Sequence, residues 1–157
     1  MPRLTEWRRD GSSLQTRIVV IASGVAALST LLPWFAYTYP SGSASATVRF
    51  IGLHDVTGRA MLLIALIEGT CALLYRRVRS ERMLGLLRVA MVLLGFVMIV
   101  IPFAAMSHVG AVAGAPANAT DSSGAIGTVV AMFASFVVLG ASWLVVLDPK
   151  MAYRRTS

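Results

Sequence analysis

Charged residues are scarce in this chain. Only 13% of its 157 residues are Asp, Glu, Lys or Arg, whereas 57% are hydrophobic. Soluble domains carry about 25% charged and roughly 45–50% apolar residues. A chain with so little charge cannot cover a globular surface of its own size in polar groups, which excludes a soluble enzyme and a disordered tail. The composition predicts an integral membrane protein, and the length predicts a single domain over residues 1–157.

Cysteine is nearly absent too, since Cys71 is the only one. A single cysteine excludes a disulfide framework and a cysteine-based metal site within one chain. His54, Asp55 and His108 are the remaining candidate metal ligands, but zinc needs three or four ligands that converge. The sequence therefore predicts no metal and no cofactor. It also contains no nucleotide-binding or hydrolase motif, so we expect no enzyme, and a membrane enzyme using these three residues is the alternative.

Four long apolar runs are present instead, at residues 18–37, 57–75, 83–106 and 125–147. A helix needs about 20 apolar residues to cross the hydrocarbon core of a bilayer. The first run exceeds the roughly 7–15 apolar residues of a signal peptide, which favours a retained span over a cleaved one. We predict an all-α membrane protein, a four-transmembrane-helix bundle. Residues 47–53, in the first outer loop, are rich in β-branched and aromatic side chains and favour a short β segment.

Basic residues gather on one side of these four runs. All but Arg49 and Arg59 of the 14 Lys and Arg residues lie in the terminal segments, between the second and third runs, or just inside the third. Because Lys and Arg in short loops stay cytoplasmic, we expect a multi-pass plasma-membrane protein with both termini in the cytoplasm. Arg76, Arg77 and Arg79 lie next to the bilayer and suit anionic lipid headgroups. No nucleic-acid-binding motif accompanies them, so nucleic acid is not an expected partner.

Apart from Arg59 at the very start of the second run, two charged residues lie within the apolar runs. Glu68 is seven residues from the cytoplasmic end of the second run, and Arg88 is five residues from that of the third. At about 1.5 Å per residue, their depths differ by about 3 Å, so an arginine side chain could reach the carboxylate. We predict an intramembrane ion pair that fixes helix register. The alternative is a proton or cation transport role for Glu68.

Small residues recur at four-residue spacing in the fourth run, at Gly127, Ala131 and Ser135. In lipid, such faces let helix backbones approach closely, because no hydrophobic force drives helices together. The pattern predicts either packing within this bundle or a face that docks a partner subunit.

The layout resembles a known class of small membrane proteins. A first helix ending in Leu32-Pro33-Trp34, an extended outer loop, and Gly52 and Gly58 before the second helix resemble small four-span proteins common in actinobacteria. The layout is also similar to claudin-like four-span proteins. We expect a non-enzymatic accessory or scaffold subunit of a larger envelope complex for transport, secretion or respiration, or alternatively a small proton- or ion-coupled transporter or channel using Glu68. The expected partners are the lipid bilayer and other membrane subunits, or further copies of the chain.

Overall fold

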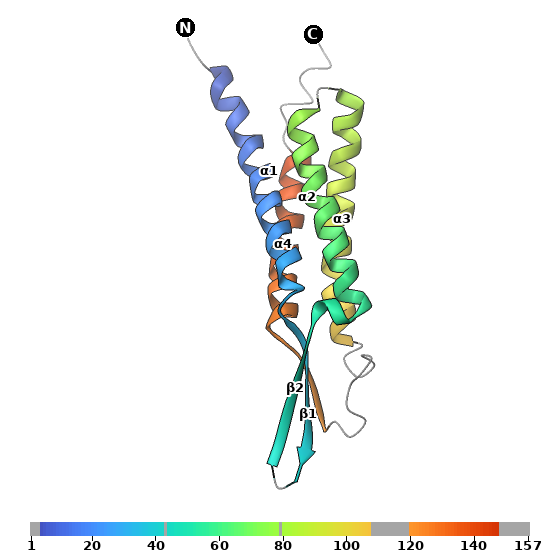
Figure 1. Cartoon of the computed structure of the whole chain (residues 1–157). Helices are drawn as coiled ribbons and strands as arrows, with labels where there is room; N and C mark the ends of the chain where they lie inside the picture. Colours follow the sequence, from blue (N-terminus) through green and yellow to red (C-terminus); the bar gives the residue numbers. More distant parts are fainter. Residues whose placement is uncertain (1–3, 43, 79, 108–119, 148–157) are drawn as a thin grey trace.

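The structure of the protein is a computed structural model that describes residues 4–42, 44–78, 80–107 and 120–147. Side chains are described from residue 14 onward. Four helices lie side by side, α1 (Leu4–Ser29), α2 (Val56–Arg77), α3 (Glu81–Ser107) and α4 (Ile126–Val146). Figure 1 shows the helices packed lengthwise, and each has two neighbours, because α1 and α3 each contact both α2 and α4. The chain thus forms a closed four-helix bundle.

Three of these helices, α2, α3 and α4, are long and apolar enough to cross a membrane. Their bounds agree within two residues with the apolar runs at 57–75, 83–106 and 125–147, which confirms these three spans as helices. In α1 the apolar part is shorter and runs over Leu14–Ser29. The helix ends before Pro33, so residues 33–37, expected to complete the first span, do not belong to it.

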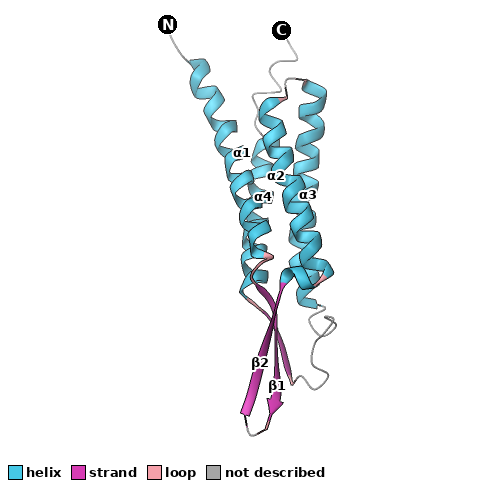
Figure 2. Ribbon diagram, in the orientation of Figure 1, coloured by secondary structure: helices cyan, strands magenta, loops and turns pink. Residues whose placement is uncertain are grey.

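Those residues open a strand that the expected all-α fold did not contain. A three-stranded antiparallel sheet stands at one end of the bundle, in the order β2-β1-β3 (Figure 2). The strands are β1 (Pro33–Ser41), β2 (Ala44–Ile51) and β3 (Asp121–Gly124). The central strand begins at proline, which cannot donate a helical hydrogen bond, and continues through aromatic residues that favour strands. The β segment predicted at 47–53 overlaps β2, and the 3-10 turn η1 (Gly52–His54) follows it.

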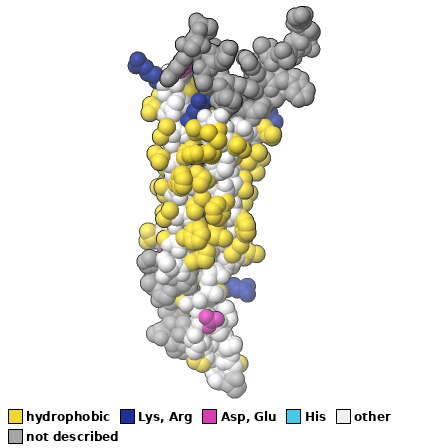
Figure 3. Space-filling model, turned by 180° about the vertical axis from the view of Figure 1, so that it is seen from behind, with side chains coloured by type: hydrophobic (Ala, Val, Ile, Leu, Met, Phe, Trp, Pro, Cys, Tyr) yellow, Lys and Arg dark blue, Asp and Glu magenta, His cyan; other side chains and the backbone are white. Residues whose placement is uncertain are grey.

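The bundle is lined by small and flexible side chains and coated with large apolar ones. Its interior holds mainly alanine and methionine, including Ala26, Met61, Met91, Met98 and Ala131, which are all fully buried. Large aliphatic and aromatic side chains instead lie exposed on all four helices, and in Figure 3 they cover the middle of the visible face. A water-soluble protein rarely exposes such a continuous apolar surface, whereas lipid tails solvate it.

Candidate functional site

The indole of Trp34 lies where the sheet meets the bundle, and it is fully buried. Its Nε1 donates a hydrogen bond of 2.9 Å to the carbonyl of Ser29, at the end of α1. Its own carbonyl accepts two bonds of 2.8 Å, from the Ala125 amide and from the Thr128 hydroxyl of α4. One residue of β1 is therefore tied to both helices that flank it.

Three glycines let the backbones close around this tryptophan. A Cβ added to Gly127 would lie 2.5 Å from Trp34 Cδ1, and one added to Gly52 would lie 2.9 Å from the same atom. A Cβ on Gly58 would lie 2.1 Å from the carbonyl oxygen of Gly52. At Gly58 and Gly127 a larger residue would require backbone movement, and at Gly52 it would require the buried Trp34 ring to shift. We call Trp34, Gly52, Gly58 and Gly127 the junction; it joins the sheet to α2 and α4 without a flexible linker.

The inner face of α4 carries hydroxyl groups at seven-residue spacing, Thr128, Ser135 and Ser142, all buried. Each binds a different element. Thr128 binds β1 as described, and Ser142 donates 3.1 Å to Glu68 Oε1 on α2. The Ser135 hydroxyl is shared between the carbonyl of Met98 on α3, at 2.9 Å, and that of Ala131 in its own helix, at 2.7 Å. Because packing and hydrogen bonds, rather than the hydrophobic effect, hold helices together in lipid, α4 acts as the element that connects the others.

Glu68 is the buried acid of the interior. It is 0% exposed, and its Oε1 accepts the bond from Ser142 while Oε2 has no hydrogen-bond partner among the described residues. The hydroxyl of Ser23 on α1 is likewise buried and has no hydrogen-bond partner among the described residues, and its Cβ lies 3.6 Å from a Cβ added to Gly69. The two orphaned groups thus belong to neighbouring helices, and a buried polar group without a partner is costly.

Glu68 and Arg88, expected to form an ion pair, have different partners in the structure. The Nε and Nη2 atoms of Arg88 donate 3.0 and 2.8 Å bonds to the hydroxyl of Tyr75, and the guanidinium carbon lies 5.6 Å from the ring centroid. Side chains on a helix tilt toward its N-terminus. Since α2 and α3 are antiparallel, Glu68 tilts toward the sheet and Arg88 away from it, where Tyr75 meets it. The predicted ion pair was based on the depths of the two residues along the helix axes, which do not include these opposite tilts.

The small-residue face of α4 is used within the chain. Gly127, Ala131 and Ser135 are all buried, Gly127 against Trp34 and Ser135 against α3. Of the two interpretations left open by the spacing, the structure places these residues in internal packing. A partner cannot reach them while the bundle is closed.

The basic and histidine candidates lie at opposite ends of the bundle. Arg76 and Arg77 are exposed in the last turn of α2, whereas Arg79 and His108 lie outside the described residues. Asp55 caps α2, its Oδ2 accepting a 2.9 Å bond from the Thr57 amide. His54 is exposed and its ring packs edge-on against Phe50. Within the described part of the chain, no three acidic, histidine or cysteine side chains gather as metal ligands.

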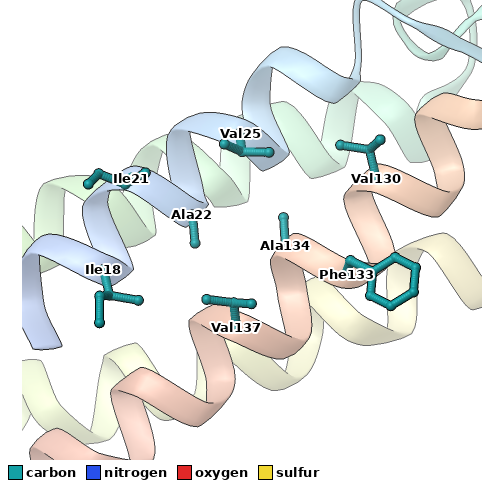
Figure 4. Close-up of a pocket in the computed structure, with 8 residues that line it drawn as sticks. All are labelled: Ile18, Ile21, Ala22, Val25, Val130, Phe133, Ala134 and Val137. Atoms are coloured by element: carbon teal, nitrogen blue, oxygen red, sulfur yellow. The ribbon is translucent and has the colours of Figure 1, made fainter.

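A crevice of about 430 Å³ lies between α1 and α4 on the surface of the bundle. Figure 4 shows its lining, with the aliphatic side chains of α1 facing those of α4 and the ring of Phe133. Every one of the eight lining residues is apolar (Ile18, Ile21, Ala22, Val25, Val130, Phe133, Ala134 and Val137). The crevice therefore offers no hydrogen-bonding group for a polar substrate and suits only hydrocarbon.

No family model and no curated protein matches this chain. The actinobacterial and claudin-like resemblances therefore stay predictions from layout.

Proposed function

We propose that the protein is a non-enzymatic membrane scaffold, an accessory subunit that anchors a small extramembrane sheet and presents it to a larger envelope complex. The junction carries this proposal. Trp34 is hydrogen-bonded to α1 and α4, and the glycines around it allow close contact between the sheet and the helices. A rigid mount of this kind is of use when the orientation of the sheet relative to the membrane matters, as it does in an assembly.

The distribution of charge supports an orientation for the scaffold. Arg76, Arg77 and Arg82 lie at the tip of the α2–α3 hairpin, at the end of the bundle opposite the sheet (Figure 1). Arg49 and Arg59 are on the sheet side, in β2 and in the first turn of α2. By the positive-inside rule, the hairpin tip and both termini are cytoplasmic and the sheet lies outside a plasma membrane that α1 crosses as a fourth span.

The membrane part of the proposal can be checked by cysteine labelling. In a Cys71→Ser background, Thr47→Cys in β2 should react in intact cells with a maleimide that cannot cross membranes. Arg77→Cys should react only after the membrane is permeabilised. The reverse pattern would contradict the orientation.

The accessory role is tested by purifying the chain in mild detergent and weighing the assembly by native mass spectrometry. A stable complex with other membrane subunits is the expected result. Gly58→Ala, which forces the junction open, should release the chain from that complex, whereas Gly24→Ala, a site with nothing within 4 Å, should not. A chain that purifies only by itself would contradict the scaffold role.

The alternative, a proton- or ion-coupled transporter, draws on Glu68. Its Oε2 is buried without a partner among the described residues, which is unusual for an acid that only stabilises the fold. In proteoliposomes, a transporter would show ion flux that is lost in Glu68→Gln. The scaffold proposal predicts that no such flux exists and that Glu68→Gln still joins the complex.

A further inference from the structure

The outer edge of β2 is the longest unpaired backbone edge in the described part of the sheet. The strand has eight residues, Ala44–Ile51, and its one described neighbour is β1. An unpaired edge presents a row of amide and carbonyl groups that can hydrogen-bond another extended chain.

The register identifies which residues make up this edge. The carbonyls of Trp34 and Thr38 accept bonds from Ala125 and Thr120, so these even-numbered residues of β1 point their backbone groups toward β3. Backbone groups alternate sides along a strand. The odd-numbered residues of β1 therefore point toward β2, where their partners are Phe50, Val48 and Ala46. The backbone groups of Ser45, Thr47 and Arg49 consequently point outward.

The two edges of the sheet differ in how well they resist pairing. Proteins protect unused edges with short strands, charges, prolines or bulges. The opposite edge is β3, four residues long and containing Asp121 and Gly124. The outer edge of β2 has no proline, and Arg49 is its only charged residue. Ser45, Thr47 and Arg49, whose backbone groups point outward, are all exposed to the surroundings.

A second copy in the same membrane fits this edge poorly. Two such copies are related by rotation about the membrane normal, so their β2 strands run in the same direction. A parallel ladder staggers the facing residues of the two strands by one position, about 3.3 Å. Rotation alone leaves Ser45, Thr47 and Arg49 of both copies level. Pairing would have to shift one bundle along the normal, against the match of its apolar surface to the bilayer.

We propose that the outer edge of β2, at Ser45, Thr47 and Arg49, binds an extended segment of a different protein on the sheet side of the membrane by β-strand addition. Main-chain hydrogen bonds would hold the segment, and the exposed side chains of the edge would select it. This inference rests on the proposed scaffold role and specifies how the scaffold holds its partner.

Proline scanning of the edge tests the proposal in the membranes of cells that make the full chain. A photoreactive residue at Ser45 reports on what lies beside the edge. Thr47→Pro removes the outward amide hydrogen, while the β1 ladder uses Ala46 and Val48 and is left intact. Thr47→Ala is the matched control, because it alters the same side chain and keeps the amide. We expect an adduct with another protein that Thr47→Ala retains and Thr47→Pro reduces at least ten-fold.

The stability of Thr47→Pro in detergent should stay close to that of the parent. If it falls, Ser45→Pro read from a photoreactive residue at Arg49 repeats the measurement on another outward amide. An adduct that survives both prolines, an adduct with a second copy of the chain, or no adduct from either position would overturn the inference. The scaffold role is tested separately by purification. A chain that purifies without partners would contradict it, whereas a complex that co-purifies with the parent and with both proline variants would support it.

Discussion

Ser142 of α4 donates a 3.1 Å hydrogen bond to Glu68 of α2 in the interior of the bundle, and both residues are 0% exposed. The bond joins two helices that are not neighbours around the bundle. Oε1 of Glu68 accepts this bond, whereas Oε2 has no hydrogen-bond partner among the described residues. The pair therefore stabilises the closed arrangement of the helices, at the expense of burying one polar oxygen.

A double-mutant cycle on this pair should show coupling. Ser142→Ala leaves a buried carboxyl group without its partner and should lower the free energy of unfolding by about 1 kcal/mol. In a Glu68→Met background the same change should cost almost nothing, because the acceptor is gone, and Glu68→Met alone should be neutral or stabilising. Unfolding in mixed micelles measures all four variants. Additive effects would show that the bond contributes nothing to stability.

The stability of the protein should depend strongly on the glycine at position 58 of the junction. Gly58→Ala places a methyl group 2.1 Å from the Gly52 carbonyl oxygen, and backbone cannot yield as a side chain can. We expect the free energy of unfolding to fall by at least about 3 kcal/mol, as in cases of severe overpacking.

Gly24→Ala is the matched control, since nothing lies within 4 Å of the added Cβ. Alanine favours helices over glycine by about 1 kcal/mol, so this variant should be neutral or slightly more stable. Thermal unfolding in detergent compares the two. A Gly58→Ala protein as stable as Gly24→Ala would mean that the helix and the turn before it are not in close contact.

The helices could be predicted from sequence because hydropathy depends on local composition. The β segment expected at residues 47–53 overlaps β2, but β1 and β3 could not be predicted. The residues of β1 from Pro33 to Tyr37 continue the first apolar run, and over so few residues hydrophobicity does not distinguish strand from helix. The sequence of β3, Asp-Ser-Ser-Gly, has no strand preference, and its conformation comes from pairing with β1, more than 80 residues earlier.

The junction was half visible in the sequence. Trp34, Gly52 and Gly58 stood out as a motif and Gly127 as a packing residue, but nothing local indicates that they meet. The seven-residue spacing of Thr128, Ser135 and Ser142 indicates a polar face on α4. That face, and not Arg88, provides the partner of Glu68. Which helix faces which depends on the packing of the whole bundle.

The partner of Arg88 provides a further prediction. A cycle with Tyr75→Phe and Arg88→Gln should give a coupling energy of about 0.5–1 kcal/mol, because the phenol accepts two bonds from the guanidinium. The corresponding cycle with Glu68→Gln and Arg88→Gln should be additive within about 0.5 kcal/mol, as for residues that share no contact. Coupling between Glu68 and Arg88 alone would restore the ion pair expected from helix depth.

Hydrogen exchange of β2 should alternate from residue to residue. The amides of Ala46, Val48 and Phe50 point toward β1 and should exchange at least ten-fold more slowly than those of Ser45, Thr47 and Arg49, which point outward. Measurement on the purified chain in detergent, by magnetic resonance at single amides, separates the two sets. Protection of the opposite set would require a one-residue slip of the hairpin, which would also exchange the two faces of the strand. Uniform protection would mean that the outer edge is already covered by this chain, leaving no room for an added strand.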